Sequence, residues 1–140
     1  MRPTAAILAL CLAALPLAPV LAEDAPALSV ELNKLEQIGT DCRSYMVLAN
    51  QTGAVLDRLS LDLVVFDTSG VIDRRLAVEL GPVAPGRTQV KVFDMSDLDC
   101  GQVARVLMND VLACVPDRIG EATTCDAALR VCGRAVEFIR

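Results

Sequence analysis

The side chains best suited to covalent chemistry in this 140-residue sequence are the cysteines beyond its N-terminal apolar stretch: Cys42, Cys100, Cys114, Cys125 and Cys132. In an oxidising compartment such thiols form disulfides. Five cysteines can form two bridges in fifteen ways. The spacing favours one of them, because Cys114 and Cys125 flank a short loop that contains proline and glycine. Cys42 is then expected to pair with Cys100.

Cys132 is left over by this pairing, and two interpretations of it are open. It is a small buried apolar side chain, as free cysteine commonly is, or it is an exposed thiol that can form a mixed disulfide. On a strand, Arg130 and Arg134 would share its face and would lower its pKa. The buried interpretation is favoured, because exposed free thiols are a liability outside the cell.

A soft-metal site is a further hypothesis for the free thiol. Cys132 together with Met46, Met95 and Met108 could hold a monovalent copper ion. No Met-x-x-Met or Cys-x-x-Cys spacing supports such a site, and methionine commonly fills protein cores. We therefore predict no metal site and no cofactor.

The stretch VVFDTSGVID, Val64 to Asp73, resembles the nucleophile loop of a haloacid dehalogenase-type phosphatase. Such an enzyme needs a second acid two positions after Asp67, where this chain has Ser69. Downstream, Lys91 is the only lysine, and no acidic pair for magnesium follows. A hairpin turn explains the same residues if Asp67 accepts hydrogen bonds from the turn amides. The sequence also has no histidine, so we predict that the protein is not an enzyme.

The N-terminus has the pattern of a cleaved signal peptide. One early cation, Arg2, precedes an apolar run from Ala5 to Leu21, and small residues end at Ala22. Residues 1–22 are expected to be removed after export to the periplasm, and residues 23–140 are expected to form one domain. No other apolar run approaches the roughly 20 residues that cross a bilayer, so no membrane span is expected in the mature chain.

Acidic residues outnumber basic ones, which bears on the partner class. The whole sequence holds 18 Asp and Glu residues against 13 Lys and Arg, and loss of Arg2 with the leader leaves a formal net charge of −6. This excess of negative charge argues against binding of nucleic acid or of an anionic membrane surface.

The elements that carry these residues follow a period of two, which is typical of strands with one buried face. Leu59, Leu61, Leu63 and Val65 form the clearest case, and the ranges 28–33, 42–50, 75–80, 87–94 and 103–114 also read as strands. Within 87–94 we expect Val90 and Val92 to face inward. A short helical turn is expected near 125–129, followed by a last strand that ends at VEFI. The pattern predicts a small immunoglobulin-like antiparallel β-sandwich of about seven strands.

Charged residues alternate with the apolar ones on these strands. Those expected on the outward, solvated side are Arg43, Asp62, Arg75, Glu79 and Lys91. Arg74 and Arg75 have two possible roles, since a charged edge strand either contacts a partner or protects the sheet from aggregation.

Five stretches, LSVELNKLE, CRSYMVLAN, LSLDLVVFDTSGVIDRRLAVEL, VKVFD and RVLMNDVLAC, resemble a family of small alphaproteobacterial periplasmic proteins labelled "Tat pathway signal sequence domain protein". The resemblance covers about Leu28 to Cys125 and implies an exported protein without assigned catalytic residues or ligands. Members usually have an acid in place of Ser69 and a serine in place of Cys132. A twin-arginine signal needs paired arginines, whereas this leader has only Arg2, so Sec export is expected.

The strand arrangement is also similar to immunoglobulin-like bacterial modules that act in binding and assembly. Two functional hypotheses follow. The first is a non-enzymatic periplasmic module that binds a protein partner of the cell envelope or helps to assemble an envelope complex. The alternative is a redox or copper-handling protein that uses Cys132 and the methionines.

Overall fold

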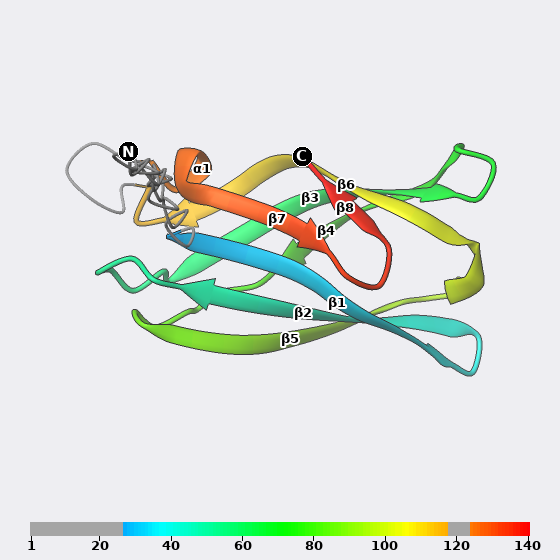
Figure 1. Cartoon of the computed structure of the whole chain (residues 1–140), viewed down its shortest axis with the longest axis horizontal. Helices are drawn as coiled ribbons and strands as arrows, with labels where there is room; N and C mark the ends of the chain where they lie inside the picture. The colour runs from blue at the N-terminus through cyan, green and yellow to red at the C-terminus, as the bar shows by residue number, and fades with distance from the viewer. Residues whose placement is uncertain (1–26, 118–123) are drawn as a thin grey trace, which may run out of the picture.

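Alternation of apolar and polar side chains produces eight β-strands that pack as two sheets in a sandwich (Figure 1). The computed structural model describes residues 27–117 and 124–140, and the predicted signal peptide lies outside them. The elements are β1 (Leu28–Ile38), β2 (Asp41–Asn50), β3 (Arg58–Asp67), β4 (Ile72–Glu79), β5 (Arg87–Met95), the 3₁₀ turn η1 (Cys100–Gln102), β6 (Val103–Val115), α1 (Cys125–Ala128), β7 (Leu129–Gly133) and β8 (Glu137–Ile139). The predicted disulfide-stabilised all-β sandwich is confirmed.

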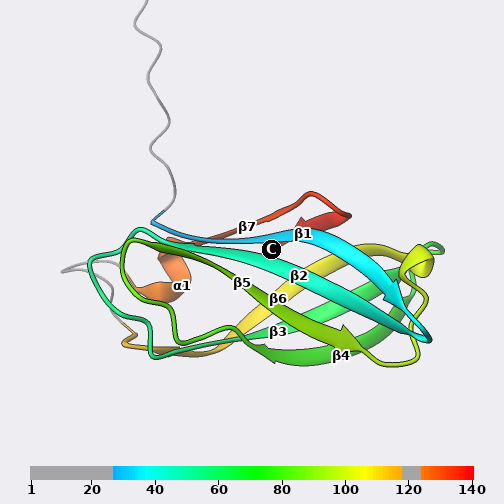
Figure 2. The same cartoon turned by 90° about the horizontal axis from the view of Figure 1, so that it is seen from below.

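The first sheet has the strand order β5-β2-β1-β7 and the second has the order β4-β3-β6-β8. Most pairs are antiparallel, but β7 runs parallel to β1 and β8 runs parallel to β6. This differs from the purely antiparallel expectation. The reason is the position of α1 near the end of β6. From α1 the chain runs beside β1 as β7 in the same direction as β1, and after a tight turn it runs beside β6 as β8 in the same direction as β6 (Figure 2).

The C-terminal segment therefore contains the predicted helical turn followed by two short strands instead of one. Thr124 caps α1, because its Oγ1 accepts a hydrogen bond from the amide of Ala127 at 3.2 Å. Gly133 ends β7 at a tight turn, where a Cβ atom would lie only 1.9 Å from the carbonyl oxygen of Val136. A larger residue cannot fit there, so glycine lets the chain cross from one sheet to the other.

The core lies between the sheets, and leucine is its commonest residue. In β3 the predicted inward residues Leu59, Leu61, Leu63 and Val65 are all buried. They pack with inward residues of the other strands, such as Leu32 of β1. Within the described residues, no helix is long and apolar enough to cross a bilayer.

The inward face of β5 is opposite to the one predicted. Val90 and Val92 are 58% and 50% exposed, while Lys91 and Phe93 lie on the inward side. The register with β2 explains this result, because Phe93 lies opposite the buried Ser44, and opposite residues of an antiparallel pair share a face. Pairing with β2 thus decides which side of β5 faces the core.

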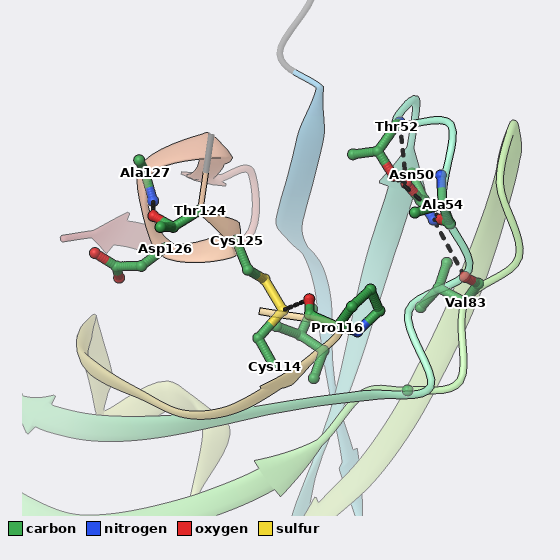
Figure 3. Close-up of a disulfide and its surroundings, with 12 residues drawn as sticks. Asn50, Thr52, Ala54, Val83, Cys114, Pro116, Thr124, Cys125, Asp126 and Ala127 are labelled. Atoms are coloured by element: carbon green, nitrogen blue, oxygen red, sulfur yellow. Dashed lines mark hydrogen bonds between the residues drawn. A yellow bond between two sulfur atoms is a disulfide. The ribbon is translucent and has the colours of Figure 1, made fainter. Parts of the chain in front are cut away.

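The two disulfides connect the sheets at opposite ends of the sandwich. Cys42 of β2 is bonded to Cys100 of η1, and Cys114 of β6 is bonded to Cys125 of α1 (Figure 3). These are the two pairs that the sequence favours. Each bond joins a strand of one sheet to the short helical segment that leads into the other sheet, so the two layers are tied together at both ends.

Candidate functional site

The two sheets are open along one side, between their edge strands β4 and β5. There the structure has a groove of about 540 Å³. On the opposite side the sandwich is closed, because β7 and β8 are joined by a short turn (Figure 2). We refer to this feature as the β4–β5 groove. Residues of both edge strands line it, from Arg74 to Glu79 on β4 and from Lys91 to Met95 on β5.

The floor of the β4–β5 groove is apolar. Leu76, Val78 and Leu80 come from the inward side of β4 and the residue that follows it, and Phe93 and Met95 come from β5. Each strand contributes alternate residues because side chains two apart point to the same face. Both edges leave backbone groups outside the ladders, since neither β4 nor β5 has a second neighbour in its sheet.

Arg74 closes one end of the groove. Its guanidinium donates to the carbonyl oxygens of Ser96 at 2.5 Å and Asp97 at 3.3 Å, and it also contacts the carboxylate of Asp73 at 2.5 Å. These bonds connect β4 to the segment after β5. Contact with a partner is one of the two possible roles of Arg74, but its side chain is engaged within the protein, where it connects the two edge strands.

Arg75 points to the outer face of the second sheet, away from Arg74. Its Nε and Nη2 atoms donate to the two carboxylate oxygens of Asp62 at 2.7 and 2.6 Å. Asn109 of β6 donates to the same carboxylate at 2.6 Å. Hydrogen bonds from Arg75 and then from Asn109 hold the pKa of Asp62 below its usual value.

The prediction that Asp62 is solvated is therefore wrong. Asp62 lies on the outward side of β3 as expected, but its side chain is only 4% exposed. The stem of Arg75 and the neighbouring strands cover it, while the Arg75 side chain itself stays 64% exposed. A carboxylate in such a place is stable because three donors from two other strands satisfy it.

Two further carboxylates on the rim of the groove are also satisfied. Asp94 binds the Arg43 guanidinium at 2.7 and 2.9 Å, which lowers the pKa of Asp94. Burial raises the pKa of Glu79, but hydrogen bonds from the backbone amides of Leu59 and Gly81 outweigh burial, so the pKa is lowered overall. These acids consequently contribute little free negative charge to the groove.

Lys91 is the exception among the charged residues that line the groove. The pattern of charges predicts an outward position, which is wrong: Lys91 lies on the inward side of β5 opposite the buried Met46. Across residues 27–117 and 124–140 its ammonium group forms no ion pair. Among the described residues, the groove therefore carries one cation that forms no ion pair. The inward position of Lys91 follows from the register of β5 with β2. The sequence of β5 alone does not indicate it, because large apolar residues occur in both phases of the alternation.

Cys132 is a free and exposed thiol on β7, so the favoured buried interpretation is wrong. Its Sγ lies 3.8 Å from a carboxylate oxygen of Glu31. Partial burial of the sulfur and the charge of Glu31 raise the pKa of Cys132, and Arg134 lowers it by less. Arg134 binds Glu31 at 3.1 and 3.4 Å, while Arg130 donates to backbone carbonyls. The expected lowering of the pKa is thus also wrong.

The proposed copper ligands do not meet. Met46, Met95 and Met108 are buried between the sheets, whereas Cys132 is at the surface. In the described part of the chain, no group of three or more His, Cys, Asp or Glu side chains could hold a metal ion.

The phosphatase-like stretch forms the predicted hairpin turn. One carboxylate oxygen of Asp67 accepts hydrogen bonds from the amides of Ser69 at 2.8 Å and Val71 at 2.9 Å. Gly70 has a φ angle of +79°, which glycine adopts readily. Asp67 thus stabilises the turn between β3 and β4.

No protein-family model, curated protein or solved structure matches this chain. The resemblance to the alphaproteobacterial periplasmic family therefore stays a prediction, and the function is inferred from the geometry of the chain itself.

Proposed function

We propose that this protein is a non-enzymatic, exported binding module that holds a protein partner in the β4–β5 groove, as an accessory of envelope assembly. The observation that carries this proposal is the open side of the sandwich, where an apolar floor lies between two edge strands. Apolar surface with a polar rim is typical of protein interaction sites.

The chemistry of the rim supports binding in preference to catalysis. Arg74, Arg75, Glu79 and Asp94 are all held by ion pairs or by hydrogen bonds to the backbone. Such groups define the shape and charge of a surface, but they are poorly placed to exchange protons with a substrate, because each is already committed to a partner.

The disulfides support export. Two bridges that join the sheets form and persist in oxidising compartments such as the periplasm. Export and the signal peptide remain part of the proposal, together with the envelope location of the partner.

Photo-crosslinking in the producing cell tests the proposal. A photoreactive amino acid replaces Ala77, an exposed residue on the β4 edge that borders the groove, and in a matched control it replaces Ala135, which is exposed in the turn between β7 and β8. We expect one discrete protein to be captured from position 77 and not from position 135. The captured protein, once purified, should bind the purified module directly. Equal capture at both positions, or no direct binding, would contradict the proposal.

The redox alternative has one observation in its favour, the exposed free thiol of Cys132. The raised pKa of this thiol reduces the thiolate fraction at neutral pH, which makes it a slow nucleophile. Modification of Cys132 in the purified native protein by a physiological disulfide or by Cu(I) would favour this alternative.

A further inference from the structure

We infer that the occupant of the β4–β5 groove is an extended segment of the partner protein, which adds to the free edge of β4 as a new strand and places an acidic side chain against Lys91. This inference rests on the proposed function, since it names the chemistry of the partner at the same site. Three observations carry it: the backbone pattern of β4, the apolar floor, and the unpaired cation.

The free edge of β4 presents a regular set of backbone groups. The amide of Leu80 donates to the carbonyl of Leu59 at 2.7 Å, and the register pairs Leu61 with Val78. Because hydrogen-bonded pairs alternate along an antiparallel ladder, Val78 and every second residue before it bond to β3. The residues between them therefore direct their N–H and C=O groups away from β3.

These residues are Arg75, Ala77 and Glu79. Their backbone groups recur every second residue along the edge, which is the pattern that a strand of another chain can continue. Their side chains point to the outer face. There Arg75 donates to Asp62, and Glu79 accepts hydrogen bonds from the amides of Leu59 and Gly81. These three side chains therefore point away from the groove, and Arg74 closes it only at one end.

A strand added here would place every second side chain into the groove. Those side chains would meet Phe93 and Met95 across the groove and would extend the row formed by Leu76 and Val78. Apolar residues at alternate positions of the partner segment would bury this floor.

Lys91 sets the charge of the segment. The other charged residues that border the groove are already matched: Arg74 with Asp73, Arg75 with Asp62, Asp94 with Arg43, and Glu79 with backbone amides and Arg58. An added strand would shield the Lys91 ammonium from water, and an unpaired cation in such a place is unfavourable. An aspartate or glutamate at one inward position of the segment would pair with Lys91, and electrostatic complementarity of this kind gives specificity.

A second copy of the chain is a poorer occupant. Edge-to-edge pairing of two β4 strands would bring a second unpaired Lys91 to the same groove. The Arg75 and Glu79 side chains that could pair across such an interface are already bound to Asp62 and to the amides of Leu59 and Gly81.

Synthetic peptides test the inference. The probes are three nine-residue peptides, Val-Thr-Val-Thr-X-Thr-Val-Thr-Val, in which X is Asp, Val or Lys. Fluorescence anisotropy measures their binding to the wild type, to Lys91→Glu, and to a control, Arg87→Glu, in which the exchanged cation is exposed on the same strand but outside the groove lining. We expect the wild type and the control to bind the Asp peptide about tenfold more tightly than the Lys peptide, and we expect Lys91→Glu to reverse this order.

Amide hydrogen exchange locates the bound peptide. Exchange at Arg75, Ala77 and Glu79 should slow on binding of the Asp peptide, and it should not slow at the edge of β7. Equal affinity for all three peptides, an unchanged order in Lys91→Glu, or no slowing at these amides would overturn the inference. So would a disulfide-linked dimer of an Ala77→Cys, Cys132→Ala variant, because it would show a second copy at this edge. If a partner is nevertheless captured from position 77, the proposed function stands and only the mode of binding fails.

Discussion

At the scale of single residues, Asp62 is the buried charge that organises the outer face of the second sheet. Its folded pKa lies below its ordinary value because Arg75 and Asn109 donate to it. A carboxyl with a lowered folded pKa stabilises the fold above its unfolded pKa of about 4, and this stabilisation is lost as the pH falls through the folded pKa. We therefore expect Asp62→Asn to lower the melting temperature by several degrees at pH 7 and by much less near pH 2.

Melting followed by circular dichroism across this pH range checks the prediction. Asp57→Asn is the matched control, because Asp57 is exposed on the segment that leads into β3; its curve should follow that of the wild type. A difference between Asp62→Asn and the wild type that does not change with pH would show that the carboxylate charge is not the source of the stabilisation.

Cys132 supports a second prediction about a single charge. Glu31 raises the pKa of this thiol through its charge and its hydrogen bond, in addition to the effect of partial burial. Glu31→Gln removes that charge and leaves Arg134 close by, so the pKa of Cys132 should fall and the thiolate fraction at neutral pH should rise. We expect alkylation by iodoacetamide at pH 7 to become several-fold faster, as measured by intact mass against time.

The pH dependence separates this electrostatic effect from a change in access. Above the pKa of Cys132 the thiol is fully ionised in both proteins, so the wild type and Glu31→Gln should react at similar rates there. A constant ratio of the two rates at every pH would point to steric access instead and would contradict the assigned cause.

At the scale of elements, β4 is the strand on which both proposals depend, and its backbone assignment can be tested directly. Leu76 and Val78 should donate to β3, whereas Arg75 and Ala77 should present free amides to solvent. In the isolated protein we expect amide exchange to be slower at Leu76 and Val78 by about two orders of magnitude or more. Exchange measured by NMR would refute the assignment if Arg75 and Ala77 were the protected residues.

The sequence predicts elements well where one phase of the alternation is clearly apolar. In β3 the inward positions hold only leucine and valine, and the outward phase includes Ser60 and Asp62. In β5 both phases contain large apolar residues, Val90 and Val92 in one and Phe93 and Met95 in the other. Local pattern cannot choose between them, and pairing with β2 decides the phase. The wrong phase places Lys91 on the outer face, so the sequence does not predict the positive charge in the groove.

The arrangement of the C-terminal segment is likewise not predictable from the local sequence alone. Its mixed spacing reflects one helical turn and two short strands, and Gly133 marks the turn between the strands because no Cβ atom fits there. The parallel pairing with β1 and β6 depends on where α1 lies relative to both sheets, and no local signal contains that information. The groove is beyond local prediction for the same reason, since it exists only where two distant edge strands meet.

At the scale of the whole molecule, the two disulfides tie the sheets together and leave the β4–β5 side to be held by side-chain contacts. The Cys42–Cys100 bridge has a sequence separation of 58 residues and the Cys114–Cys125 bridge a separation of 11. In the chain-entropy description, a longer closed loop restricts the unfolded chain more strongly. The first bridge should therefore contribute about 4 kcal/mol to the free energy of unfolding and the second about 3 kcal/mol.

Double alanine variants test this ranking. Urea unfolding followed by far-ultraviolet circular dichroism suits the protein, because it has no tryptophan. The Cys42→Ala, Cys100→Ala variant should lose the most stability, and the Cys114→Ala, Cys125→Ala variant somewhat less. Cys132→Ala is the matched control, since it removes an exposed cysteine without breaking a bridge, and it should stay within about 0.5 kcal/mol of the wild type. If the shorter bridge proved the more important one, the attachment of α1 and β7 to β6, and not the restriction of the unfolded chain, would be the main source of stability.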